Sequence, residues 1–374
     1  MHIGIPAETR PGETRVAATP ETVKKYAAGG FNKIVVQSGA GVGSSISDAE
    51  FVAAGASIAA SAAEVYAGAD LILKVRGPDT DELASLRKDQ IVIGLLAPHR
   101  SEGLQALAAR GVTGFAMEWL PRISRAQSMD VLSSQANLAG YKAVLIGANT
   151  YGRMMPMLMT AAGTIKAARV VIMGVGVAGL QAIATAKRLG AMVEATDVRP
   201  DTKEQVESLG AKFIDVPLTD AEKELAKGQG GYARDMGEDY KKRQAALIAE
   251  RIKQADIVIT TALIPGRPAP VLVTEDMVKT MRQGSVIVDM AVEQGGNCPL
   301  SEIDRTVVKH GVHLVGIANI PALVAADASA LYARNLLNFL ALMLDPKTGE
   351  FKLNREDEIV VGTLACSGGE LARK

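Results

Sequence analysis

The chain has 374 residues, more than one ordinary core accommodates, which suggests two domains. Apolar residues make up 48% of it and aromatic residues only 4%, so the core must consist mainly of small and aliphatic side chains, as in parallel sheets covered by helices. Lys and Arg total 41, and so do Asp and Glu, without a long run of either sign, which excludes the electrostatic pattern of a nucleic-acid-binding protein.

The cysteines and the apolar stretches exclude further classes. Cys298 and Cys366 have neither a CxxC nor a metal-ligand spacing, so we predict no metal site and a reducing, cytoplasmic location. The first eight residues lack the layout of a signal peptide and predict a strand entering a loop. Residues 170–186 and 322–344 are apolar, but a Gly-rich turn interrupts the first and charged residues the second, so we predict no membrane span.

Short runs rich in Val and Ile alternate along the chain with Ala-rich helical stretches, a pattern typical of βαβ units. The first predicted strands are 3–5, 34–36, 71–75, 91–96 and 112–116. After a long helix over 133–151, the second set is 170–173, 192–196, 212–216, 257–262, 286–290 and 312–315. Another long helix runs from about 326 to 344, and we expect both helices to cross between domains. The prediction is an α/β fold with two Rossmann-like, doubly wound parallel-sheet domains.

The predicted first domain is discontinuous. Because the tail after residue 345 is too short to fold alone, we assign 1–136 plus 321–374 to the first domain and 137–320 to a Rossmann NAD(H)-binding domain. Residues 219–242 break the strand–helix rhythm with charges and four glycines, and they exceed a typical connection in α/β units. We predict a mobile loop there, with a solvated connection as the alternative.

A glycine-rich motif directly follows the strand at 170–173 and precedes a helix over 180–189. This context gives a GxGxxG motif its meaning as a dinucleotide-binding turn. The first glycine permits the turn, the second lets backbone approach the pyrophosphate, and the third lets the helix pack on the sheet. The predicted phosphate-binding residues are Gly174, Val175, Gly176, Val177, Ala178 and Gly179.

An acidic residue ends the next strand, roughly twenty residues further on, where the fingerprint expects a carboxylate for the ribose hydroxyls. Asp197 occupies this position and favours NAD, because it would repel the 2′-phosphate of NADP. Val198 and Arg199 follow it, and Arg199 is ambiguous because an arginine binds a 2′-phosphate or stacks beside adenine. Leu263 ends a later strand and is a candidate wall of the adenosine site, with a core role as the alternative.

Several motifs along the chain resemble the family of alanine dehydrogenase and the NAD(H)-binding component of proton-translocating transhydrogenase. They are 6–10 (PAETR), 15–17 (RVA), 74–75 (KV), the Gly-rich turn, 291–296 (AVEQGG) and 318–321 (ANIP). Two segments are more similar to the transhydrogenase: 121–130 with 132–135 resembles its loop that holds the dihydronicotinamide, and 230–233 with Met236 resembles its mobile loop over bound nucleotide.

The resemblance implies roles for individual residues. Gln127 would position the nicotinamide ring and face the NADP⁺ of a partner. The other residues implied around the nicotinamide are Arg122, Ile123, Ser124, Ser128, Met129, Asp130 and Ser133. Gly231, Tyr232 and Gln244 would close over the adenosine side. For each residue the alternative is an ordinary surface or interdomain contact.

The chain departs from the alanine dehydrogenase pattern at its acid–base positions. Ala97 stands where an ungapped alignment puts the catalytic His, and Glu293 stands where the dehydrogenase has an Asp. His99 is a possible substitute, since it lies two residues from Ala97 and would share its face on a strand. Direct hydride transfer between two nicotinamides needs no such pair. Arg15 and Lys74 match residues that bind the substrate carboxylate in alanine dehydrogenase, and their role here stays open.

The resemblance therefore implies an NAD(H)-binding subunit that passes hydride from NADH to NADP⁺ on a partner subunit, coupled to proton translocation by separate membrane subunits. It implies a homodimer, cytoplasmic and peripheral to the inner membrane. The alternatives are an alanine dehydrogenase-like amino-acid oxidoreductase and a non-catalytic NAD-sensing module.

Overall fold

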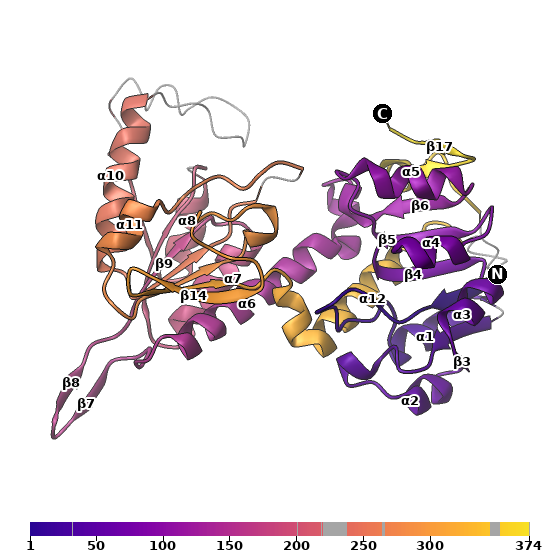
Figure 1. The fold of residues 1–374 in the computed structure, drawn as a ribbon, viewed down its shortest axis with the longest axis horizontal. Helices are drawn as coiled ribbons and strands as arrows, with labels where there is room; N and C mark the ends of the chain where they lie inside the picture. The colour runs from indigo at the N-terminus through magenta and orange to yellow at the C-terminus, as the bar shows by residue number, and fades with distance from the viewer. Residues whose placement is uncertain are drawn as a thin grey trace. The chain divides into compact units, whose positions relative to one another are not determined.

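The computed structural model describes residues 1–31, 33–199, 201–217, 219, 238–263, 266–344 and 352–373. It divides into two compact units, unit 1 with Met1–Gln135 and Pro321–Lys374, and unit 2 with Ala136–Ile320. Each unit is built on its own sheet (Figure 1).

Unit 1 contains an eight-stranded sheet in the order β17-β16-β6-β5-β4-β1-β2-β3. Its strands are β1 (His2–Ile5), β2 (Lys33–Gln37), β3 (Ser57–Ala59), β4 (Leu71–Arg76), β5 (Ile91–Leu95), β6 (Thr113–Ala116), β16 (Leu364–Ser367) and β17 (Glu370–Leu371). The first six are parallel, while β16 runs antiparallel to β6 and β17 antiparallel to β16. The C-terminal residues thus complete the sheet that the N-terminal residues begin, so unit 1 is made of two separate parts of the chain.

Helices cover both faces of this sheet. They are α1 (Pro20–Ala28), α2 (Asp48–Ala53), α3 (Ala62–Gly68), α4 (Thr80–Ser85), α5 (Ser101–Ala109), α12 (Ala325–Ala341) and α13 (Glu358–Thr363). Successive side chains of a strand enter different cores: Leu71 and Leu73 of β4 pack in the cluster that contains α1 and α12, and Ile72 packs in the cluster that contains α5. This alternation buries both faces of the strand and explains its uninterrupted apolar start.

Unit 2 contains a seven-stranded sheet in the order β11-β10-β9-β12-β13-β15-β14. Its strands are β9 (Arg169–Met173), β10 (Met192–Thr196), β11 (Lys212–Phe213), β12 (Ile257–Thr260), β13 (Val286–Asp289), β14 (Arg305–Lys309) and β15 (Val312–Gly316). All are parallel except β14, which pairs antiparallel with β15. The fold class is the predicted doubly wound α/β.

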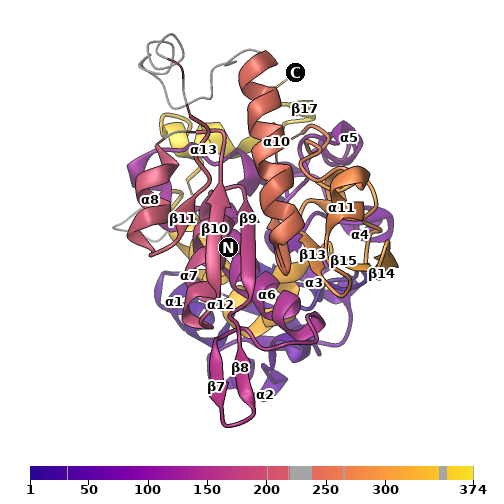
Figure 2. The ribbon, with the colours of Figure 1, turned by 90° about the vertical axis from the view of Figure 1, so that its left-hand side faces the viewer.

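The helices of unit 2 again lie on both faces. They are the C-terminal part of α6 (Val131–Thr150), α7 (Val177–Arg188), α8 (Thr202–Ser208), α10 (Glu238–Gln254) and α11 (Glu275–Thr280). Val170 and Ile172 of β9 pack with α6 and α7, whereas Val171 packs with α10 and α11. A separate hairpin, β7 (Leu158–Thr160) and β8 (Gly163–Ile165), extends away from the sheet in both views (Figures 1 and 2), and all of its strand residues are exposed.

Some predicted elements differ from the observed ones. The strands β3, β7, β8, β14, β16 and β17 were not predicted, and β11 ends at Phe213 rather than Val216. The second long helix, α12, was expected to cross between domains, but all of its residues belong to unit 1, where Tyr332, Leu336 and Phe339 are buried in the core. Among the described residues, no helix is long and apolar enough to cross a membrane.

Candidate functional site

The Gly-rich turn links β9 to α7 at the carboxyl edge of the sheet in unit 2. Its first glycine, Gly174, has φ = 101°, a left-handed conformation that L side chains rarely adopt. At Gly179 a Cβ atom would lie 1.9 Å from the carbonyl oxygen of Gly174, so only glycine allows the helix to start this close to the strand. A Cβ on Gly176 would meet nothing within 4 Å, because this residue faces open space. The three glycines thus have different physical roles, two structural and one open to a ligand.

The amino end of α7 is available to an anion. Gly176 is its N-cap, and no side chain in the described part of the chain caps it by a hydrogen bond. The first N–H groups of a helix have no partner inside the helix, and the helix dipole adds a partial positive charge there. The chain turns from β9 toward β10 on one side and continues with β12 on the other, so this turn lies at the switch point of the strand order, where doubly wound sheets bind ligands.

Residues of neighbouring elements hold the Gly-rich turn in place through hydrogen bonds and close packing. Thr261, just after β12, donates its hydroxyl to the carbonyl oxygen of Gly174 at 3.0 Å. Asn297, fully buried, is hydrogen-bonded to both backbone groups of Ala262, at 2.9 and 3.1 Å. On the other side, a Cβ on Gly140 of α6 would lie 2.1 Å from the carbonyl oxygen of Ala178. Sequence reasoning missed these three supporting residues, because no motif links them to the turn.

Asp197 follows β10 and lies beside the Gly-rich turn. Its side chain is 7% exposed, and one carboxylate oxygen accepts a hydrogen bond from the backbone N–H of Val175 at 2.7 Å. The backbone N–H and the guanidinium of Arg199 donate to the same carboxylate at 2.9–3.1 Å. Burial raises the pKa of Asp197, but the hydrogen bonds from Arg199 and Val175 outweigh it, so the pKa lies below its ordinary value. The group is therefore an anion at neutral pH.

The other residues predicted on the adenosine side are spread over several elements. Val198 and Leu263 are 66% and 46% exposed, so both present apolar surface rather than core. Gln244 is half-buried on α10. Gly231 and Tyr232, with the rest of 220–237, lie outside the described residues.

In unit 1, the predicted nicotinamide loop forms the 3₁₀ helix η3 (Ser124–Met129) and leads into α6. Ala126 and Met129 are buried in the core, so the side chain of Met129 anchors the loop instead of facing solvent. The carbonyl oxygen of Ser128 accepts hydrogen bonds from Asn335 and Asn338 of α12, at 2.8 and 3.0 Å. The loop is therefore held on a rigid base.

The remaining side chains of this loop face outward or cap the next helix. Ser124 and Gln127 are exposed, Arg122 is also exposed, and Ile123 is half-buried against the core. Asp130 accepts hydrogen bonds from the backbone N–H and the hydroxyl of Ser133, at 2.9 and 2.6 Å. This pair fixes the start of α6, while the exposed amide and guanidinium remain accessible.

The residues predicted at the acid–base positions of alanine dehydrogenase, Ala97 and Glu293, and the candidate substitute His99 lie outside the strands. β5 ends at Leu95, so His99 lies on an exposed turn, and the expectation that it shares a strand face with Ala97 is wrong. Ala97 has φ = 50° and donates its N–H to Glu118 at 2.8 Å. Glu293 is exposed on the 3₁₀ helix η4 (Val292–Gln294).

Arg15 and Lys74 are both buried and paired with carboxylates of unit 1. Arg15 forms two hydrogen bonds with the carboxylate of Glu13, at 2.6 and 2.7 Å. Lys74 contacts Glu82 at 2.5 Å and lies 3.7 Å from Glu8. A substrate carboxylate would have to displace these internal partners, which leaves the two cations with a structural role in this conformation.

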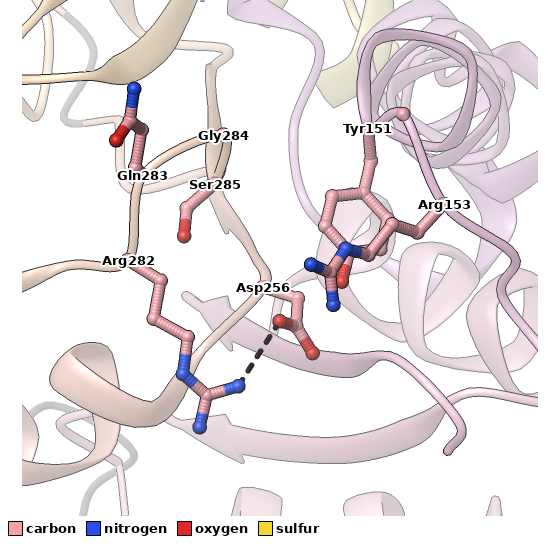
Figure 3. Close-up of a pocket in the computed structure, with 8 residues that line it drawn as sticks. Tyr151, Arg153, Asp256, Arg282, Gln283, Gly284 and Ser285 are labelled. Atoms are coloured by element: carbon pink, nitrogen blue, oxygen red, sulfur yellow. Dashed lines mark hydrogen bonds and ion pairs between the residues drawn. The ribbon is translucent and has the colours of Figure 1, made fainter. Parts of the chain in front are cut away.

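A pocket of about 250 Å³ lies elsewhere in unit 2 (Figure 3). Tyr151, Arg153, Asp256, Arg282 and Ser285 contribute to its lining, and Arg282 contacts Asp256 at 3.4 Å. Burial, together with the Asp256 carboxylate, raises the pKa of Tyr151 to about 12. Since Asp256 and Ser285 directly precede β12 and β13, the pocket lies at the amino edge of the sheet, away from the Gly-rich turn at the carboxyl edge. It is therefore distinct from the candidate dinucleotide site.

Two family models match nearly the whole chain: "Alanine dehydrogenase/PNT, N-terminal domain" matches residues 4–139, and "Alanine dehydrogenase/PNT, C-terminal domain" matches residues 143–374. The chain is 55% identical to an NAD(P) transhydrogenase subunit alpha of Rhodospirillum rubrum, over 99% of this chain and 97% of that relative. It is 32% identical to the alanine dehydrogenase of Methanococcus maripaludis, over 91% of this chain and 86% of that enzyme.

Solved structures give the same ranking between these two groups. A transhydrogenase from Sinorhizobium meliloti superposes with a TM-score of 0.90 at 50% identity, covering 99% of this chain and all of that one. An L-alanine dehydrogenase superposes with a TM-score of 0.80 at 27% identity, covering 99% and 96%. The chain therefore belongs to the alanine dehydrogenase/PNT family, and it is more similar to these transhydrogenases than to these alanine dehydrogenases.

Proposed function

We propose that this chain is the NAD(H)-binding component of a proton-translocating transhydrogenase and passes hydride from NADH to NADP⁺ bound on a partner subunit. The observation that carries the proposal is a Gly-rich turn with an adjacent buried carboxylate, in a chain 55% identical over 99% of its length to a transhydrogenase alpha subunit. The net reaction converts NADH and NADP⁺ into NAD⁺ and NADPH, so one hydride moves and no further redox partner is needed.

The residues of unit 2 fit the adenosine and pyrophosphate moieties of a dinucleotide. The uncapped start of α7 supplies N–H groups and a positive dipole for phosphate oxygens, and the open space at Gly176 leaves room for them. Asp197 supplies the anionic acceptor for ribose hydroxyls. Val198 and Leu263 offer exposed apolar surface suited to an adenine ring. We assign NAD(H) to this unit and NADP(H) to the partner subunit.

Unit 1 would position the nicotinamide end through the loop 122–133. Arg122, Ser124 and Gln127 present hydrogen-bonding groups to solvent from a loop anchored by Met129 and Ser128. Such anchoring restricts the motion of the amide of Gln127, which we assign to orienting the ring and its carboxamide. Bound NADH itself supplies the hydride, so the chain needs groups that bind and orient rather than an acid–base pair.

The partner subunits are inferred from the names of the relatives in the family. We propose that separate membrane subunits carry the proton path and the NADP(H) site, because the relatives are named as a portion of subunit alpha rather than as a whole enzyme. The chain would then be cytoplasmic and peripheral to the inner membrane. We also propose a homodimer, supported by the β7–β8 hairpin and the residue before it, where Met157, Met159 and Ile165 are 62%, 72% and 44% exposed.

The deciding experiment mixes the purified chain with an NADP(H)-binding transhydrogenase component and follows hydride transfer between nicotinamide analogues. We expect transfer only in the mixture. The alternative, an alanine dehydrogenase, predicts oxidation of alanine by the chain alone, and an NAD-sensing module predicts NADH binding without transfer in any mixture. Alanine oxidation without transfer would overturn the proposal.

Gln127→Asn tests the role of the loop in the same assay. The shortened side chain misplaces the ring but leaves the adenosine contacts intact, so the transfer rate should fall on the order of a hundredfold while NADH affinity changes little. Gln105→Asn, at an exposed position of α5, is the matched control. Equal losses in affinity and rate would make Gln127 a general binding contact instead.

A further inference from the structure

The carboxylate of Asp197 is saturated with hydrogen bonds from the chain itself. A carboxylate offers about four lone-pair positions. Oδ1 accepts from the backbone N–H and Nε of Arg199, at 2.9 and 3.0 Å. Oδ2 accepts from the backbone N–H of Val175 and from Nη2 of Arg199, at 2.7 and 3.1 Å. In this conformation Asp197 has no position left for a ribose hydroxyl.

Two of these four donors are fixed and two are movable. The N–H groups of Val175 and Arg199 belong to the backbone, and Thr202 holds the carbonyl oxygen of Arg199 through its hydroxyl at 2.7 Å. The other two donors belong to the Arg199 side chain, which is 43% exposed and also donates from Nη2 to the Val175 carbonyl oxygen at 3.2 Å. Rotation of this one side chain frees one position on each oxygen of Asp197 without moving the backbone.

The adenosine ribose of NADH has two free hydroxyls, which matches the two positions that Arg199 would release. We propose that Arg199 is a specificity-determining residue whose guanidinium occupies the places of the ribose hydroxyls on Asp197 and leaves them when NADH binds. This inference rests on the proposed binding of NADH at the Gly-rich turn. It assigns Arg199 a competing role, distinct from stacking on adenine or holding a 2′-phosphate.

The same pair also affects the choice between the two dinucleotides. While Arg199 lies on Asp197, it screens the carboxylate charge, so a 2′-phosphate meets less repulsion than from a lone carboxylate. Removing the guanidinium should therefore favour NADH twice, by freeing the hydroxyl positions and by exposing the 2′-phosphate to the full charge of Asp197.

The test is Arg199→Met, which keeps an unbranched side chain and removes the charge and the donors. Titrations should show NADH bound roughly two- to fivefold more tightly, the size expected for loss of a competing exposed ion pair. The ratio of NADH to NADPH affinity should rise, and the gain in NADH affinity should shrink at high salt because salt already weakens the pair. Arg199→Lys, with fewer donors, should lie between the two proteins.

Arg305→Met is the matched control, because Arg305 forms an exposed pair with Glu302 at 3.4 Å on β14 and should not affect either dinucleotide. Weaker or unchanged NADH binding by Arg199→Met, with an unchanged melting temperature, would overturn the inference and make the guanidinium a direct ligand or a bystander. Absence of NADH binding by the unmutated chain would instead contradict the proposed function.

Discussion

The two units share one fold, but they differ in which groups lie next to the backbone N–H donors at the carboxyl edges of their sheets. In unit 1 the chain provides its own acceptor there: the side chain of Glu118 accepts hydrogen bonds from the N–H groups of Leu96 and Ala97, at 3.1 and 2.8 Å, just after β5. In unit 2 the Gly-rich turn leads into α7, whose N-cap, Gly176, provides no side chain. An internal carboxyl group thus satisfies backbone donors in one unit, and a phosphate would satisfy them in the other.

The difference shows how one architecture supports either stability or binding. Buried charges in unit 1 are paired within the unit, as Lys74 is with Glu82, so they fix the loops around the strand ends. The Gly-rich turn of unit 2 instead depends on glycines, and Gly176 leaves open space beside the start of α7. Function then depends on which residues occupy this edge, not on the fold.

The largest effect is expected when the buried ion pair between Lys74 and Glu82 of unit 1 is broken. Glu82→Ala removes the carboxylate 2.5 Å from Lys74 Nζ and leaves Glu8 at 3.7 Å. Because a buried cation without its close partner is strongly unfavourable, the free energy of unfolding should fall by about 3–5 kcal/mol. Urea unfolding monitored by circular dichroism measures this. A loss below about 1 kcal/mol would show that the pair behaves like an exposed one.

The next effect distinguishes Gly179, where the packing requires glycine, from Gly176, which faces open space. Gly179→Ala places a Cβ 1.9 Å from the Gly174 carbonyl oxygen, so the turn must distort and NADH affinity should fall about a hundredfold or more, with a lower melting temperature. Gly176→Ala meets nothing within 4 Å, so the fold should keep its stability while NADH binds more weakly. Calorimetry and NADH titration on both variants test this. Equal melting temperatures would contradict the assigned roles.

A smaller effect is expected at the anionic acceptor. Asp197→Ala removes the proposed charged acceptor for the ribose hydroxyls and should weaken NADH binding roughly ten- to a hundredfold. NADPH affinity should change less, since the lost carboxylate also repelled its 2′-phosphate. If the unmutated chain bound NADH and NADPH equally, Asp197 would not select between them.

The smallest effect concerns Glu21, an exposed carboxylate that forms ion pairs with Lys25 and Arg334. It contrasts with the buried pair of Lys74 and Glu82 in the same unit. Hydrogen bonds from Arg334 and Lys25 lower the pKa of Glu21 to about 2. Its contribution to stability is therefore present above the ordinary value of 4.5 and lost as the pH falls toward about 2. Glu21→Gln should cost less than about 1 kcal/mol at neutral pH, and this difference should disappear in acid. A constant difference across this range in urea unfolding would exclude the carboxylate charge as its cause.

The central strands and the Gly-rich turn could be predicted because their sequence carries the necessary information. β9 and β4 contain continuous apolar runs, as strands buried on both faces must. The edge strands β3 and β14 escaped prediction: β14 has no buried residue, and Ser57–Ala59 is a short run paired on one side. Their pairing depends on neighbours distant in sequence, which local patterns do not encode.

The candidate site was predictable to a similar degree. The glycines and Asp197 follow from spacing, because the βαβ geometry fixes their separation. The supports of the turn, Thr261 and Asn297, come from other strands and depend on tertiary hydrogen bonds. The saturation of Asp197 by Arg199 likewise depends on side-chain geometry, which explains why sequence alone left the role of Arg199 ambiguous.

The discontinuity of unit 1 has a consequence for synthesis on the ribosome. All residues of unit 2 are contiguous, so this unit has its whole sheet once residue 320 has emerged. Unit 1 begins first but finishes last, because Tyr332 and Phe339 of α12 fill its core and β16 pairs with β6 near the C-terminus. During the interval, the first 135 residues expose apolar surface that their final partners will cover. The nascent chain should therefore depend on chaperones most strongly in its N-terminal third, and a truncation before α12 should leave unit 2 folded and attached to an aggregation-prone N-terminal segment.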